Sequence, residues 1–135
     1  MEWRVPLADL DYGPEEESAA LEVLQRRWLT MGALTQQFEE EFARFVGTKH
    51  ALALSNATAA LHLACLALGI GPGDEVIVPA LTFVASANAV LYTGARVRFV
   101  DIVGPEELNI SPLEIEKNIT PATRSRCLLF SISRR

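Results

Sequence analysis

Apolar residues in the N-terminal part of the chain recur every three or four positions, which is the spacing of an amphipathic helix. The clearest case is residues 34–46, where a glutamate run faces away from the apolar stripe and Gly47 provides a stop. The stripe consists of Leu34, Phe38, Phe42 and Phe45. We expect this stripe to pack in the core.

Residues 15–28 begin with acidic residues after Pro14 and end with basic ones, an order that the helix dipole favours. We therefore expect a surface helix there.

From residue 50 onward, short apolar runs alternate with helical segments. The predicted strands are residues 50–54, 75–78, 97–100 and 127–132, and the predicted helices between them are residues 57–68, residues 83–92 and a segment capped by Ser111. For that last helix, Ser111 provides the cap, Pro112 occupies the first turn and Glu114 is placed to close a capping box. This alternation predicts a layered α/β sheet.

Composition narrows the class of partner. The 135 residues are 50% hydrophobic and 21% charged with a net charge of -5, which fits one globular domain and disfavours a nucleic acid or anionic membrane partner. The uncharged stretches 51–73 and 76–95 are interrupted by polar residues, glycine or proline, so we expect no membrane insertion. The start of the chain shows no signal peptide, which makes the cytoplasm the expected location.

The two cysteines, Cys65 and Cys127, predict neither a disulfide framework nor a metal site, and we expect both to be buried thiols.

The loops after the predicted strands are the places to look for a ligand, because ligands of open α/β sheets bind at the carboxyl ends of the strands. Residues 55–60 are small or hydroxyl-bearing and lead directly into a helix. The free amides of that helix would form an anion cup, to which the Thr58 hydroxyl adds a hydrogen bond. The alternative is an ordinary helix cap provided by Ser55 or Asn56.

Two other loops carry side chains of interest. Phe83, in the loop after the second strand, either covers a flat ring at the same edge of the sheet or is buried between helix and sheet. Asp101 ends the third strand and is either a polar contact or a turn former. The glycine-rich residues 69–74 are predicted to be a turn, because Asp74 replaces the third glycine of a dinucleotide fingerprint and the segment leads from helix to strand.

Taken in succession, these residues resemble the DegT/DnrJ/StrS family of pyridoxal-phosphate-dependent sugar aminotransferases. The resemblance covers about residues 5–124 and runs through residues 28–32, 38–43, 55–64, 73–79, 82–85 and 99–102. It implies a three-layer α/β/α fold, the N-terminal part of the large domain of a fold-type I pyridoxal-phosphate transferase. The single incomplete domain, residues 1–135, would comprise N-terminal helices in residues 1–48 and part of the α/β sheet in residues 49–135.

The resemblance also implies roles for particular residues. Ala57, Thr58 and Ala59 would hold the phosphate of pyridoxal 5'-phosphate, and Phe83 would stack on its pyridine ring. Trp28, Thr30 and Gly32 would line the sugar pocket. Members of the family are homodimers that move an amino group, usually from glutamate, to a keto sugar carried on a nucleotide.

The cofactor's chemistry requires a lysine amine and a carboxylate at the pyridine nitrogen. The chain has two lysines: Lys49 would lie roughly 16 Å from the cup along the first predicted strand, and Lys117 is expected on a solvated helix face. We therefore assign no catalytic residue. In the family, the lysine and the carboxylate both come from segments of the chain beyond the part that is matched here. Residues 124–135 depart from the family pattern, as in a truncated sequence. The leading hypothesis is an N-terminal aminotransferase fragment, inactive alone. The alternatives are a sugar dehydratase of the same fold and a non-catalytic remnant or interaction module.

This interpretation has a consequence for folding. In the family, later strands lie between the first and second strands predicted here. Residues 50–54 would then lack their neighbours in the sheet and expose amides and apolar side chains. We expect poor solubility or dependence on a partner.

Overall fold

A computed structural model describes residues 10–125 of the chain, with side chains through residue 123. The chain divides into two compact units, Met1–Ala53 and Leu54–Arg135. The predicted strand at residues 127–132, including Cys127, lies outside the described residues. No helix in the described range is long and apolar enough to cross a membrane.

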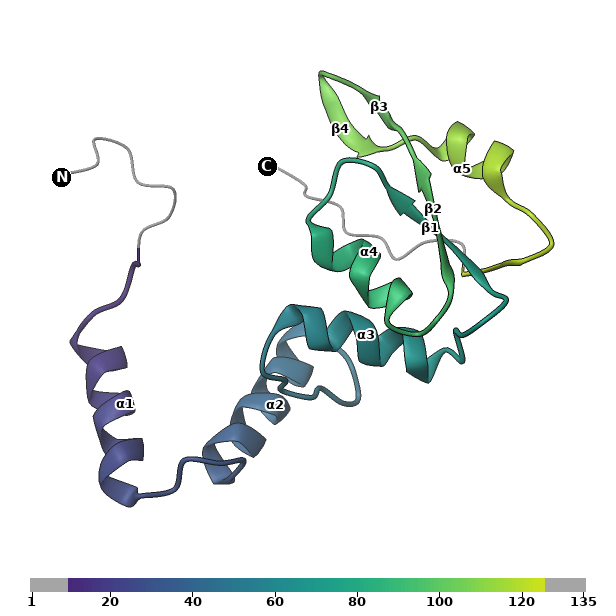
Figure 1. Ribbon diagram of the computed structural model, residues 1–135. Coiled ribbons are helices and arrows are strands. Elements are labelled where there is room, and N and C mark those ends of the chain that lie inside the picture. Colours follow the sequence, from purple (N-terminus) through teal and green to yellow (C-terminus); the bar gives the residue numbers. More distant parts are fainter. Residues whose placement is uncertain (1–9, 126–135) are drawn as a thin grey trace, which may run out of the picture. The chain divides into compact units, whose positions relative to one another are not determined.

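The first unit contains the two predicted helices, α1 (Pro14–Arg26) and α2 (Ala33–Val46) (Figure 1). At the start of α1, the Glu16 carboxylate accepts the Gly13 N–H at 2.7 Å, and three glutamates occupy the first turn. Helix α2 ends at Gly47, whose φ of 74° is a conformation that glycine adopts without steric cost. Gly47 ends α2 as predicted, and both helices begin and end within two residues of their predicted limits.

The apolar stripe of α2 is not a packed core in this structure. Phe38 is 58% exposed and Phe45 is 87% exposed, whereas Ala43 is the buried residue of the helix. The rings of Phe38 and Phe42 contact each other, with centroids 5.9 Å apart. The prediction of core packing is wrong here, because within residues 10–53 no element covers the stripe.

The second unit is a layered α/β structure. Its elements are α3 (Ala57–Ala67), β1 (Glu75–Pro79), α4 (Val84–Leu91), β2 (Arg96–Val100), β3 (Ile102–Gly104), β4 (Glu107–Ile110), α5 (Pro112–Asn118) and β5 (Thr123–Ser125). The parallel sheet has the order β2-β1-β5. Strands β3 and β4 form a separate antiparallel hairpin (Figure 1). The alternation of strands and helices is the layered α/β arrangement that the sequence predicts.

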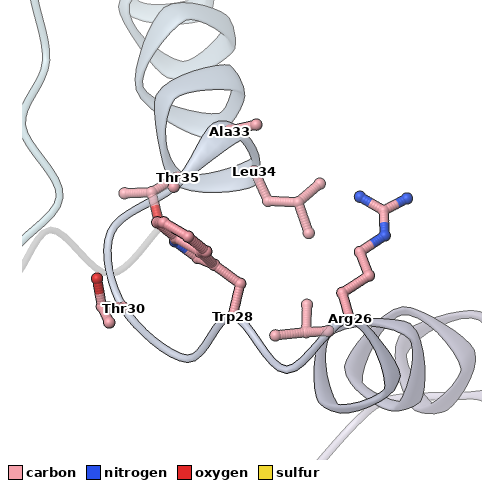
Figure 2. Close-up of a pocket in the computed structure, with 8 residues that line it drawn as sticks. Arg26, Trp28, Thr30, Ala33, Leu34 and Thr35 are labelled. Carbon is pink, nitrogen blue, oxygen red and sulfur yellow. The ribbon is translucent and has the colours of Figure 1, made fainter.

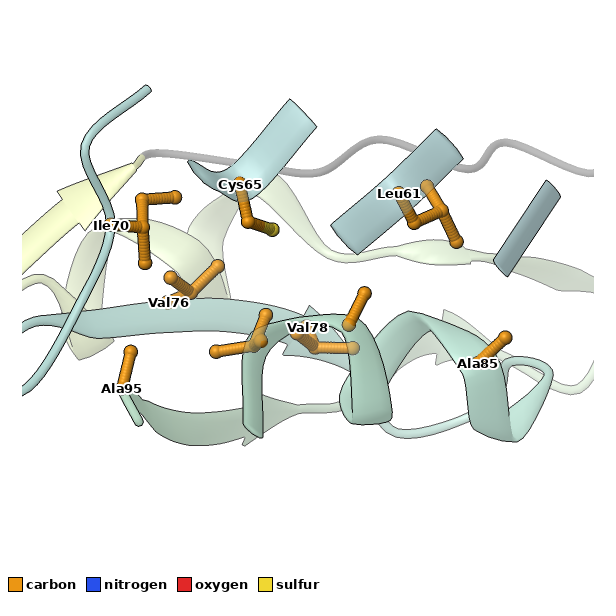
Figure 3. Packing of buried hydrophobic residues seen from close by; sticks show 9 residues of the cluster. Leu61, Cys65, Ile70, Val76, Val78, Ala85 and Ala95 are labelled. Atoms are coloured by element: carbon orange, nitrogen blue, oxygen red, sulfur yellow. The ribbon is translucent and has the colours of Figure 1, made fainter. Parts of the chain in front are cut away.

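Strand β1 is the centre of the core. All five of its residues are buried, which is expected of a parallel strand covered on both faces. Val76 and Val78 pack with Leu61 and Cys65 of α3 and with residues of α4 (Figure 3). Ile77, on the opposite face by strand alternation, is fully buried as well. Burial also raises the pKa of the Cys65 thiol, because the thiolate would lose its hydration.

Two local predictions need correction, and one element was missed. Residues 50–54 form no strand: Leu52 is 80% exposed, and the Ala53 N–H donates to the Glu39 carboxylate at 2.7 Å rather than to a sheet partner. The β3–β4 hairpin was not predicted. The Ser111 hydroxyl caps α5 as predicted, because it accepts the Glu114 N–H. The predicted capping box does not form. The Glu114 carboxylate binds Lys117 instead, and the Ser111 N–H donates to the Asp101 carbonyl.

Candidate functional site

Two helix N-termini lie at the same end of the sheet. Helix α3 leads through the predicted turn at residues 69–74 into β1, and α4 follows β1, so both helices run antiparallel to the strand. In Figure 3, Leu61 and Ala85 lie toward Val78, whereas Ile70 and Ala95 lie toward Val76. The loops that precede α3 and α4 are therefore both at the carboxyl end of β1, where ligands of such sheets bind.

The α3 N-terminus is capped and still has free donors. The Asn56 side chain accepts the Ala59 N–H at 2.8 Å and donates to the Ser55 hydroxyl at 3.2 Å. Of the two cap residues considered from the sequence, Asn56 is the one that caps. The amides of Ala57 and Thr58 are left without a partner inside the helix, and Ala57 is exposed. An anion at this end would meet these two amides, because the third, from Ala59, is already bonded to Asn56.

Phe83 sits at the N-cap of α4 with φ -71° and ψ 142°. Its side chain is 73% exposed, so the alternative of burial between helix and sheet is wrong. Around it, the Ser86 N–H donates to the Phe83 carbonyl at 3.0 Å, and the Thr82 and Ser86 hydroxyls lie 2.9 Å apart. An exposed aromatic ring therefore stands at the same end of the sheet as the free α3 amides.

Asp101 acts as a turn former. Its carboxylate accepts the N–H of the next residue, Ile102, at 2.8 Å, and its carbonyl accepts the Ser111 N–H at 3.1 Å. The residue is exposed and shapes the connection from β2 into the hairpin. Of the two roles considered from the sequence, this geometry favours the turn.

In the first unit, the segment between α1 and α2 encloses a hollow of about 390 Å³ (Figure 2). The three residues predicted to line a sugar pocket all line it, together with others that sequence reasoning missed: Val23, Arg26, Trp28, Thr30, Gly32, Ala33, Leu34 and Thr35. The Trp28 Nε1–H donates to the Met31 carbonyl at 3.1 Å. A Cβ at position 32 would lie 2.6 Å from Trp28 Nε1, so glycine at this position leaves room for the indole.

The two lysines are both exposed. Lys117 lies on α5, is 68% exposed and donates to the Glu114 carboxylate at 2.6 Å, as expected of a solvated helix face. Lys49 is exposed in the segment after α2. The 16 Å separation expected along a strand does not apply to it, because residues 50–54 form no strand.

The buried charge of the second unit lies at the other end of β1. The Glu75 carboxylate accepts hydrogen bonds from Arg98 Nε at 2.8 Å, from Arg98 Nη2 at 3.2 Å and from the Thr120 hydroxyl at 3.0 Å. The Arg98 guanidinium holds the pKa of Glu75 below its usual value, although burial acts in the opposite direction. Because both oxygens of the Glu75 carboxylate accept hydrogen bonds within the protein, this pair links β1 to β2. Residues 10–125 contain no group of three or more side chains arranged to hold a metal ion.

Comparison with known proteins places this geometry in context. A family model described as the DegT/DnrJ/EryC1/StrS aminotransferase family matches residues 11–129. The spore coat polysaccharide biosynthesis protein SpsC of Bacillus subtilis is 50% identical over 113 residues, which are 84% of this chain and 29% of that protein.

Two solved structures show the same fold. The putative sugar aminotransferase Spr1654 from Streptococcus pneumoniae, in its PLP form, superposes with a TM-score of 0.83 at 31% identity over 90% of this chain and 31% of that one. The GDP-4-keto-6-deoxy-D-mannose-3-dehydratase of E. coli, with bound hydrated PLP, gives a TM-score of 0.79 at 32% identity over 87% and 32% of the two chains. The chain thus spans about three tenths of the length of these proteins.

Proposed function

The chain belongs to the DegT/DnrJ/EryC1/StrS aminotransferase family, and we propose that it is the cofactor-holding N-terminal part of a pyridoxal-phosphate enzyme. That enzyme transfers an amino group, from glutamate, to a keto sugar carried on a nucleotide. The observation that carries the proposal is the pair of free amides at the α3 N-terminus, at the same end of the sheet as the exposed Phe83 ring.

The residues at this end suit the cofactor's two recognisable parts. The amides of Ala57 and Thr58, the positive end of the α3 dipole and the Thr58 hydroxyl would bind the phosphate. The methyl side chains of Ala57 and Ala59 leave the backbone open to an approaching oxyanion. The exposed Phe83 ring would cover one face of the pyridine. When bound, pyridoxal phosphate supplies the electron sink for amino-group chemistry.

Neither lysine of this chain is in a setting that activates its amine. Lys117 is engaged by Glu114 on an exposed helix face, and Lys49 is exposed in the segment after α2. The reaction requires a lysine amine that exchanges protons with the substrate carbon and a carboxylate at the pyridine nitrogen. We therefore infer that these 135 residues bind the cofactor and do not turn substrate over alone.

The hollow between α1 and α2 supplies groups suited to a sugar. The Trp28 indole, fixed by its bond to the Met31 carbonyl, offers an apolar face to sugar C–H groups, and Thr30 and Thr35 offer hydroxyls. The nucleotide-linked keto sugar named for the E. coli neighbour supports this substrate class. We also propose that the longer protein acts as a homodimer in the cytoplasm, as is usual in the family.

A dehydratase is the second candidate, because this chain is as similar to the E. coli dehydratase as to the pneumococcal aminotransferase. The two reactions give different products from a nucleotide-linked 4-keto sugar: an amino sugar in one case and a 3-deoxy sugar in the other. Mass spectrometry of the product formed by the longer protein separates the two candidates. A chain that binds no cofactor would instead favour the third possibility, a non-catalytic interaction module.

Cofactor binding by the 135-residue chain tests the proposal directly. In equilibrium dialysis, we expect Ala57→Glu to weaken pyridoxal 5'-phosphate binding about tenfold or more, because a carboxylate would face the phosphate at short range. Ala64→Glu, at an exposed position further along α3, should leave the affinity unchanged. Pyridoxal without the phosphate should bind more weakly and should not distinguish the two variants. Equal weakening by both variants, or equal binding of both ligands, would contradict the anion cup.

A further inference from the structure

The loop that carries Phe83 is held by hydrogen bonds at both ends. At its start, the Ala80 N–H donates to the Val100 carbonyl of β2 at 2.8 Å. At its end, the Ser86 N–H donates to the Phe83 carbonyl at 3.0 Å. Between these two bonds, the Thr82 and Ser86 hydroxyls are 2.9 Å apart and span the residue that presents the ring.

The Ser86 hydroxyl forms one hydrogen bond, to the Thr82 hydroxyl. It is 5% exposed, and the buried residues around it on α4 are alanines and a valine: Ala85, Ala87, Ala89 and Val90. An alanine at position 86 would fill almost the same space. A hydroxyl buried here is unfavourable unless it forms a hydrogen bond, and Thr82 provides that bond. The hydroxyl of Ser86 is thus present for its contact with the loop.

Helix α4 has no side-chain hydrogen bond at its N-cap, so few contacts hold its first turn. Phe83 occupies the cap position, where serine, threonine, aspartate or asparagine would normally fix the first turn with a side-chain hydrogen bond. Phenylalanine cannot form that bond. The Thr82–Ser86 pair is instead a link between side chains, which joins the residue before the cap to the first turn of the helix.

We propose that Thr82 and Ser86 are positioning residues, a hydroxyl clamp that fixes the backbone on both sides of Phe83 and so aims its ring at the cofactor. The inference rests on the proposed function, in which Phe83 covers the pyridine. Because the Phe83 side chain is 73% exposed, the ring has little packing of its own to hold it. Its direction therefore depends on the backbone that the clamp fixes.

The clamp is tested first without any ligand. In the full 135-residue chain, 15N relaxation should give backbone order parameters of about 0.8 for residues 81–83. We expect Ser86→Ala or Thr82→Val to lower these order parameters below about 0.6. Thr93→Val is the matched control, because it removes a hydroxyl that donates to the Val90 carbonyl at 2.7 Å beyond the other end of α4. The control should leave residues 81–83 unchanged. Low order parameters in the unmodified chain, or no change in the two clamp variants, would overturn the proposal.

Cofactor affinity then shows whether the clamp acts through Phe83. We expect Ser86→Ala and Phe83→Ala each to weaken pyridoxal 5'-phosphate binding about twofold to tenfold. In the Phe83→Ala background, Ser86→Ala should cause no further loss, a result that general loosening of the fold would not give. If Phe83→Ala has no effect, the proposed role of the ring is wrong. If Phe83→Ala weakens binding and Ser86→Ala does not, the clamp alone is wrong.

Discussion

Arg27 has a backbone conformation that its side chain disfavours. It follows the last residue of α1 with φ 55° and ψ 25°, and within residues 10–125 it is the one residue other than glycine with positive φ. Its N–H donates to the Leu24 carbonyl at 3.1 Å, so the conformation satisfies a carbonyl at the helix end. The left-handed region costs an L-residue roughly 1–2 kcal/mol.

Replacing Arg27 by glycine should relieve this strain. Part of the gain is offset, because glycine makes the unfolded chain more flexible, and we expect Arg27→Gly to stabilise the chain by about 0.5–1 kcal/mol. Urea unfolding followed by circular dichroism measures the difference. Arg26→Gly, inside the last turn of α1, should instead destabilise by about 1 kcal/mol. A loss of stability in Arg27→Gly would contradict the strain argument.

Gly32 controls the position of the Trp28 indole. A Cβ at position 32 would lie 2.6 Å from Nε1 and 2.7 Å from Cδ1 of Trp28, so any side chain there displaces the ring. We expect Gly32→Ala to break the Trp28–Met31 hydrogen bond at a small cost in stability, about 1 kcal/mol, because the exposed indole is free to rotate away. Acrylamide quenching of Trp28 fluorescence, measured in a Trp3→Phe background, should increase. Gly104→Ala, where an added Cβ meets nothing within 4 Å, is the control.

Among the elements, β1 has the most specific electrostatic requirement. Glu75, at its first residue, is 5% exposed and receives hydrogen bonds from Arg98 of β2 and from Thr120, just before β5. The Arg98 hydrogen bonds hold the pKa of Glu75 below the ordinary glutamate value of 4.5. A carboxyl group with a lowered pKa in the folded state stabilises the fold above its unfolded pKa. That stabilisation is lost as the pH falls through the lowered value.

The stability of the chain should therefore decrease as the pH falls below 4.5. We expect Glu75→Gln to be less stable than the unmodified chain at neutral pH and to show a shallower decrease on acidification. Urea midpoints measured from pH 7 to pH 3 give both quantities. Glu40→Gln, at an exposed position of α2, should follow the unmodified chain. Parallel pH curves for Glu75→Gln and the unmodified chain would show that the ion pair does not contribute.

The elements that the sequence predicted well are those whose signals are local. The caps and apolar spacing of α2, the glycine turn before β1 and the serine cap of α5 all involve residues within a few positions of each other. Residues 50–54 have the composition of a strand, but a strand needs a neighbouring chain segment to receive its hydrogen bonds, and none of the described segments pairs with it. The β3–β4 hairpin joins strands of three and four residues, too short for a periodic signal.

The candidate site shows the same division. The order of residues located the exposed ring of Phe83, which follows β1, and the free amides of α3, because a helix begins at Ala57 even though the strand predicted before it does not form. The Thr82–Ser86 clamp and the contribution of Arg26 to the hollow depend on which side chains meet, and no spacing rule indicates that. Nor did the apolar stripe of α2 reveal which of its residues would be covered.

On the scale of the whole chain, the exposed apolar surface stands out. Large apolar side chains are exposed in both units, among them Phe38, Phe42, Phe45 and Leu52 in the first and Leu63, Leu66 and Phe99 in the second. Clusters of this kind mark surfaces that bind other protein, or regions prone to aggregation. Phe45 is the extreme case, because it is 87% exposed.

We therefore expect the 135-residue chain to self-associate as its concentration rises, and Phe45→Ser to weaken that association. The substitution should change the free energy of unfolding by no more than about 0.5 kcal/mol, because the exposed ring has few contacts to lose. Sedimentation velocity over a range of concentrations measures the association. Leu108→Ser removes a 58% exposed apolar side chain from the β3–β4 hairpin and should leave the association unchanged. If both variants associate like the unmodified chain, the α2 stripe is not the surface responsible, and the exposed apolar residues of α3 become the next to replace.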